Sequence, residues 1–94
     1  MSEALRADIF RPRIGQTVSV AGCGDLTLVS LEESATQAHG AFRAFSLVLR
    51  GPPAPILSEG VHRLTFAEGG TFDLYMMPIH THSRSHQDYQ IAFN

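Results

Sequence analysis

Six short strand-like runs constrain this chain more than any other feature of its sequence; five alternate apolar and polar residues, and one, residues 26–32, has apolar residues on both faces and is expected to be covered on both sides. The six runs cover residues 17–20, 26–32, 45–50, 61–66, 72–76 and 89–93, and glycine or proline lies in every segment between them. A period of two is typical of a strand that buries one face, because successive side chains of a strand point to opposite sides. The sequence therefore predicts six β-strands.

The connections between the predicted strands are short, so strands that follow each other in the chain are expected to pair. The predicted fold class is mainly β: a six-stranded antiparallel meander that forms a small barrel or sandwich, and both forms stay open. Residues 34–43 are small and polar and are predicted to form a loop between the second and third strands. Prolines 52, 53 and 55 predict a stiff loop before the fourth strand, because proline cannot donate a ladder hydrogen bond.

A short helix over residues 2–10 is predicted to precede the strands. Leu5 and Ile9 have the i, i+4 spacing that places two apolar side chains on one helix face, and Ser2 is a candidate N-cap. Pro12 is expected to end this helix.

The length of 94 residues predicts one domain, residues 1–94. Apolar residues make up 44% of the chain and charged residues 17%, so we expect a globular protein with a lightly charged surface. The 7 basic residues are all arginine, and the formal net charge is −2. The arginines do not form a basic cluster that could follow a phosphate backbone, so nucleic acid is not an expected partner.

The N-terminal residues predict a cytoplasmic location, unless a secretion or assembly machine exports the chain without a cleaved signal. Glu3, Arg6 and Asp8 interrupt the apolar residues there, so the segment has no signal-peptide core, and no run of about 18 apolar residues follows that would cross a membrane. A membrane partner is therefore not expected. The single cysteine, Cys23, cannot form an internal disulfide, which agrees with a reducing compartment.

A set of short pieces follows a fixed order along the chain. The pieces are Gly15-Gln16-Thr17, Leu26-Thr27-Leu28-Val29, Phe45-Ser46-Leu47, Arg50-Gly51-Pro52, Glu59-Gly60 and the closing Tyr89…Ala92-Phe93-Asn94. Taken together they resemble a bacterial family known as domain of unknown function 6916, over nearly the whole chain. The resemblance implies no established activity, and it associates the chain with small proteins encoded beside phage-tail-like collar proteins. Residues 80–87 depart from the family pattern, in which acidic and glycine-rich turn residues are expected.

His80, His82 and His86 are candidate ligands for a zinc or nickel ion. They form the pattern H-x-H-x3-H, which could bring three imidazoles to one metal at a strand end followed by a turn. A structural zinc normally takes a fourth ligand, and Asp88 is the nearest candidate. The alternative is a solvated loop in which the histidines are ordinary polar residues. No other cofactor is predicted.

The sequence contains no G-x-S-x-G, H-E-x-x-H, Walker lysine or C-x-x-C motif, so no enzyme activity is predicted. Cys23 lies between two glycines at an expected turn, with no arginine or histidine beside it to activate the thiol. We expect a non-catalytic structural or protein-interaction module, which the resemblance links to a phage-tail-like assembly. Exposed strand edges, or outer apolar residues such as Val48 and Tyr75, would pair with another copy or another protein. The alternative is a small-molecule or metal-binding protein that uses the barrel interior or the loop containing His80, His82 and His86.

Overall fold

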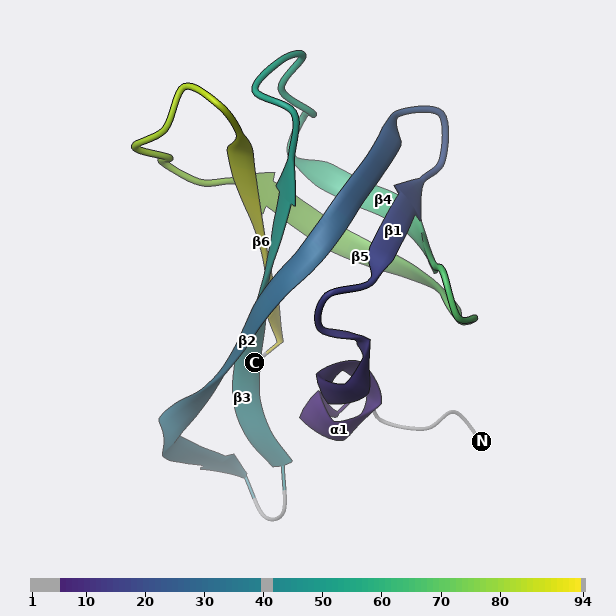
Figure 1. The fold of residues 1–94 in the computed structure, drawn as a ribbon. Helices are drawn as coiled ribbons and strands as arrows, with labels where there is room; N and C mark the ends of the chain where they lie inside the picture. The colour runs from purple at the N-terminus through teal and green to yellow at the C-terminus, as the bar shows by residue number, and fades with distance from the viewer. Residues whose placement is uncertain (1–5, 40–41, 94) are drawn as a thin grey trace.

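Six strands alternate buried and exposed residues and close into a barrel. The computed structural model describes residues 6–39 and 42–93. Its strands are β1 (Thr17–Val20), β2 (Gly24–His39), β3 (Phe42–Gly51), β4 (Gly60–Phe66), β5 (Thr71–Pro78) and β6 (Gln87–Phe93). All pairs are antiparallel, and the sheet closes in the order β1-β2-β3-β6-β5-β4 (Figure 1). The prediction of six antiparallel strands is confirmed, and of the two predicted forms the chain adopts the barrel.

The predicted meander is wrong at one connection, because β3 and β4 follow each other in the chain but are not neighbours in the sheet. Within each of the sets β1–β2–β3 and β4–β5–β6, consecutive strands pair. The connection from β3 to β4 crosses one end of the barrel, so that β4 pairs with β1 and β3 pairs with β6. The resulting order β4-β1-β2-β3 is a Greek key. The crossing occurs at the proline-rich segment 52–59, which is too long and too stiff for a hairpin turn.

The inward positions of the strands form one hydrophobic core. Its buried members are Ala7, Phe10, Val18, Val20, Leu26, Leu28, Phe45, Leu47, Leu49, Leu64, Phe66, Leu74, Met76, Tyr89 and Ile91. No polar or charged residue is buried among the residues whose side chains the structure describes. Burial of this apolar surface is the main stabilising term of the fold.

One end of the barrel is closed by the helix α1 (Ala7–Phe10) and the following 3-10 turn η1 (Arg11–Arg13). Figure 1 shows both below β1, at the end of the barrel opposite the β1–β2 turn. Phe10 is fully buried, with its ring centroid 5.2 Å from that of Phe72 and 5.5 Å from that of Phe93. The short helix therefore acts as a plug for the core.

Arg13 fastens this plug to the turn between β4 and β5. Its guanidinium donates hydrogen bonds to the carbonyl oxygens of Ile9 and Gly69 and lies 5.7 Å from the centroid of the Phe66 ring. A cation over an aromatic face adds an attractive electrostatic term.

The helix differs in extent from the prediction over residues 2–10. Residues 1–5 lie outside the described residues, so the expected roles of Ser2 and Leu5 are not described, and the helical segment starts at Ala7. The α-helix ends at Phe10, the predicted last residue, and Pro12 is the second residue of the 3-10 turn that follows. Proline fits there because the first residues of a helix have no partner for their N–H groups.

The predicted loop over residues 34–43 is wrong for most of its length. Strand β2 continues to His39 and β3 begins at Phe42, while residues 40–41 lie outside the described residues. No glycine or proline interrupts the sequence between Leu26 and His39, so nothing stops the strand there. We call residues 30–39 and 42–44 the arm; its base packs against the core through Leu31, and its outer part extends past the body of the barrel (Figure 1). The molecule measures 40 × 27 × 23 Å along its principal axes.

Among the described residues, no helix has the length and apolar content to cross a membrane.

Candidate functional site: the arm and the histidine loop

The arm exposes an unpaired strand edge on an otherwise closed sheet. Strand β1 pairs with β2 from Gly24 to Thr27, and the backbones of Gly15 and Gln16 add hydrogen bonds to Leu28. Within the described residues no strand pairs with this side of β2 from residue 30 to residue 39. The opposite side of β2 pairs with β3 out to His39, which faces Phe42, with register shifts on either side of Gln37. One row of backbone N–H and C=O groups is therefore left without a strand partner.

The base of the arm is held against the N-terminal plug. The guanidinium Nη2 of Arg11 lies 3.1 Å from Oε1 of Glu33, and Nε of Arg11 lies 3.6 Å from Oδ1 of Asp8. These side chains are partly or largely exposed, so the ion pairs orient the arm more than they stabilise it. The edge beyond Glu33 extends away from this contact.

The sequence of the edge lacks the features that usually block strand addition. Natural edge strands carry lysine, proline or inward-pointing charges that prevent another strand from pairing. Residues 34–39 read Ser-Ala-Thr-Gln-Ala-His and contain none of these. The edge is nevertheless irregular, because the β2–β3 register shifts between Glu33 and Gln37 and again between Gln37 and His39, and bulges of this kind also hinder strand addition.

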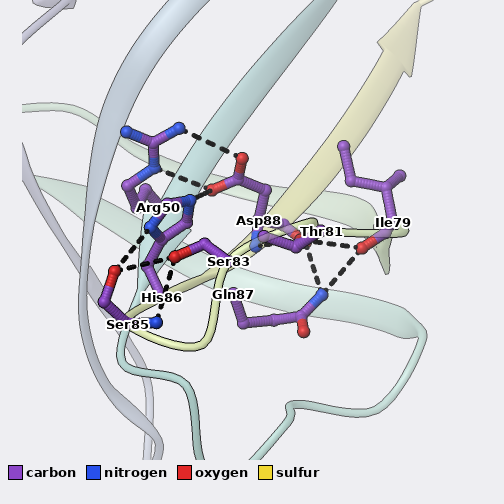
Figure 2. A network of polar contacts seen from close by, with 8 residues as sticks. All are labelled: Arg50, Ile79, Thr81, Ser83, Ser85, His86, Gln87 and Asp88. Carbon is purple, nitrogen blue, oxygen red and sulfur yellow. Dashed lines mark hydrogen bonds and ion pairs between the residues drawn. The ribbon is translucent and has the colours of Figure 1, made fainter.

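The segment between β5 and β6, residues 79–86, forms the histidine loop, and hydrogen bonds to the start of β6 order it (Figure 2). The side-chain amide Nε2 of Gln87 donates to the carbonyl oxygen of Ile79 at 2.8 Å. The hydroxyl of Thr81 accepts from the backbone N–H of Asp88 at 3.0 Å and donates to the carbonyl of Ile79. The backbone N–H of Ile79 donates to the carbonyl of Asp88.

An ion pair between β3 and β6 anchors the end of this loop. Arg50 and Asp88 are directly opposite in the β3–β6 register, and Nε and Nη2 of Arg50 donate to the two carboxylate oxygens at 2.9 and 3.2 Å (Figure 2). The hydrogen bonds from Arg50 and its positive charge lower the pKa of Asp88 below its ordinary value, and His86 adds to the effect. The carboxylate of Asp88 is thus committed to Arg50.

The three candidate metal ligands have different surroundings. The rings of His80 and His82 lie edge to face with centroids 4.4 Å apart, and both residues are exposed. His86 instead faces the Arg50–Asp88 pair, with Nε2 3.7 Å from Oδ1 of Asp88. Within the part of the chain that the structure describes, no group of three or more His, Cys, Asp or Glu residues is arranged to hold a metal ion. The structure therefore brings together two of the predicted ligands.

Acid is expected to destabilise the barrel below about pH 4, and Asp88→Asn to remove part of that loss. The folded-state pKa values of Asp88 and of Asp73, which pairs with Arg63, are lowered by hydrogen bonds from their arginines. A lowered pKa means that the carboxylate stabilises the fold fully above its unfolded-state pKa, and that this contribution is lost as the pH falls through the folded-state value. Urea midpoints measured between about pH 2 and 7 check this.

The urea midpoint of Asp88→Asn should be lower than that of the wild type at neutral pH, and the two midpoints should converge in acid. Arg50→Gln, which removes the partner, should flatten the curve in the same way. Parallel curves would contradict the assignment.

The other predicted surface residues lie apart from the arm. Tyr75 is 49% exposed and stands opposite Val61, which is 68% exposed, on the outer face of the β4–β5 hairpin. The hydroxyl of Tyr75 donates to Glu59, and this hydrogen bond raises the pKa of Tyr75. Val48 is only half-buried, and Cys23 is exposed at the β1–β2 turn as predicted.

Sequence reasoning missed the arm and the Arg50–Asp88 pair. The signal for the arm was available, because no breaker residue occurs between Leu26 and Gly40. The ion pair depends on the β3–β6 pairing across the Greek key, which nothing local in the sequence indicates.

Comparison with protein families gives one match. The family model described as "Domain of unknown function (DUF6916)" covers residues 5–93. No curated protein and no solved structure matches the chain.

Proposed function

This chain belongs to the DUF6916 family, and we propose that it is a non-catalytic protein-interaction module that binds through the free edge of the arm. The observation that carries the proposal is the pairing of β2, which, within residues 6–39 and 42–93, has a strand on one side only from residue 30 to residue 39. An extended segment can add to such an edge, because the backbone hydrogen bonds of a strand do not depend on a particular side chain.

The filled interior of the barrel favours a surface role over small-molecule binding. Phe10, Phe45 and Phe66 occupy the end of the barrel near α1, with the ring centroids of Phe45 and Phe66 6.1 and 6.0 Å from that of Phe10. At the other end the buried hydroxyl of Tyr89 accepts a hydrogen bond from the N–H of Leu57 in the 52–59 loop. A barrel of this size is expected to be filled by its own side chains.

The energetics of strand addition fit a role in an assembly. Each new backbone hydrogen bond contributes about 0.5–1.5 kcal/mol net, so a pairing of a few residues is weak by itself. Many copies in one particle multiply such contacts through avidity. An assembly of the phage-tail-like kind, which the family resemblance suggests, would provide that multiplicity.

The proposal is tested by a charge placed on the edge. Thr36→Lys puts a lysine in the middle of the edge segment, and the matched control Thr65→Lys puts the same residue at an exposed position of β4, which is paired on both sides. Tagged wild-type and variant chains are used to capture proteins from extracts of cells that make the untagged chain. Native mass spectrometry then identifies the bound species, including untagged copies.

The expected result is a specific partner that binds the wild type and Thr65→Lys and is lost with Thr36→Lys. Equal capture by all three chains, or no specific partner for any of them, would overturn the proposal. Circular dichroism must first show that each variant is folded.

A second candidate function is metal binding at His80 and His82, and the observation in its favour is the contact between their rings. Two imidazoles suit zinc or nickel, but tetrahedral zinc takes four ligands, so binding by one chain is expected to be weak. Calorimetric titration with zinc and with nickel should give one weak site that His82→Ala abolishes.

The matched control is His62→Ala, because His62 is bonded to the carbonyl of Ser58 and lies outside the pair. Binding that survives His82→Ala, or that is lost equally with His62→Ala, would rule out this candidate.

A further inference from the structure

We propose that His80 and His82 form one half of a zinc site, and that a second copy of this chain supplies the other half through the same two histidines. The inference rests on the second candidate function, metal binding by this pair, and names what completes the coordination of the ion. It does not depend on the edge of the arm.

The two imidazoles are held close together and face solvent. Their ring centroids lie 4.4 Å apart, and both residues are exposed. Thr81, between them, is partly buried; its hydroxyl accepts from the backbone N–H of Asp88 and donates to the carbonyl of Ile79. These hydrogen bonds fix the backbone that carries both rings, so a metal ion meets two ligands that are already close to each other, which lowers the entropic cost of binding.

The chain offers this pair no further ligand. His86 faces the ion pair of Arg50 and Asp88, with its Nε2 3.7 Å from Oδ1 of Asp88, and the carboxylate of Asp88 accepts both hydrogen bonds from Arg50. Among residues 6–39 and 42–93, no third histidine, cysteine or carboxylate completes a metal-holding group. Because zinc takes four ligands in a tetrahedral arrangement, an ion held by His80 and His82 keeps two positions open.

A second copy presents the ligands that the ion lacks. Two identical pairs related by a two-fold axis through the ion give four imidazoles, which suit zinc, and two-fold dimers are the commonest oligomers. Each chain has a formal net charge of −2, so a divalent cation between two copies also offsets their mutual repulsion. The histidine loop projects from the barrel at the end opposite α1, which leaves room for a second copy (Figure 1).

Sedimentation velocity and calorimetric titration with zinc test the inference, on chains purified without a polyhistidine tag. The protein concentration is chosen so that the EDTA-treated chain is monomeric. Zinc should convert the wild type to a dimer that contains one zinc per two chains, and EDTA should reverse the change. A large excess of zinc should return part of the protein to monomer, because each pair then takes its own ion.

Matched variants locate the ligands. His80→Ala and His82→Ala should each stay monomeric with zinc, and both should remain folded by circular dichroism, because the residues are exposed in a loop. His62→Ala should dimerise like the wild type, because His62 is bonded to the carbonyl of Ser58 and lies outside the pair. Thr36→Lys should also dimerise with zinc, because the arm lies at the other end of the barrel (Figure 1).

The outcomes separate this inference from the proposed functions. Binding of zinc to a chain that stays monomeric at every zinc concentration would overturn the bridge and leave metal binding by one chain standing. No zinc binding, or a zinc dimer that survives both His80→Ala and His82→Ala, would overturn the inference together with the second candidate function. A zinc dimer formed equally by the wild type and Thr36→Lys supports the inference, whatever the capture experiment shows for the arm.

Discussion

Replacing Phe10 by alanine is expected to lower the free energy of unfolding by about 3–5 kcal/mol. Phe10 is fully buried, and its ring contacts four others. Its centroid lies within 6.1 Å of the ring centroids of Phe45, Phe66, Phe72 and Phe93. Removing it leaves a cavity at the end of the barrel and deprives four rings of a neighbour. Urea denaturation followed by circular dichroism measures the loss.

The loss approaches the whole stability of a domain of this size, so two further variants are needed. Phe10→Leu keeps part of the volume and should remain folded with an intermediate loss. Ile14→Ala changes an exposed residue just after the plug and should cost no more than about 0.5 kcal/mol. Equal losses at Phe10 and Ile14 would show that the plug does not hold the core together.

Replacing Gly51 by alanine is expected to cost about 1–3 kcal/mol, although only one methyl group is added. A Cβ atom at residue 51 would lie 2.3 Å from Cδ2 of Leu26, which is itself buried. The side chain of Leu26 must move into a packed core to make room. The effect comes from this close approach of β2 to the end of β3, and thermal and urea denaturation measure it.

A double-mutant cycle separates this contact from other effects of the substitution. In a Leu26→Ala background the obstructing methyl group is gone, so Gly51→Ala should then be nearly neutral. The same loss in both backgrounds would contradict the steric explanation.

The strands and their inward faces were predictable because each is decided locally. In β3, for example, Phe45, Leu47 and Leu49 are buried as their alternation with polar residues predicts. The barrel form and the β1–β4 pairing were not predictable, because closure depends on contacts between residues far apart in sequence. Val18 lies opposite Phe66 in that pairing, and no local sequence pattern indicates that these two distant residues pair.

The sequence predicted that a strand edge would be exposed, but it did not predict which segment would provide that edge. An exposed strand edge was expected, yet the segment that provides it was interpreted as a loop because it lacks an apolar stripe. That reasoning fails for the arm, since a strand outside the barrel has no core to face and needs no apolar alternation. The contact between His80 and His82 agrees with their spacing in the sequence, whereas the position of His86 is determined by the Arg50–Asp88 pair.

The Greek-key crossing also affects the order in which the chain folds. Loop-closure entropy opposes contacts between distant residues, so the β1–β4 pairing that completes the barrel is expected to form after the local hairpins. The β2–β3 hairpin is one of these local units, and during synthesis it leaves the ribosome before β4 does. The arm and its edge are therefore expected to form before the barrel has closed.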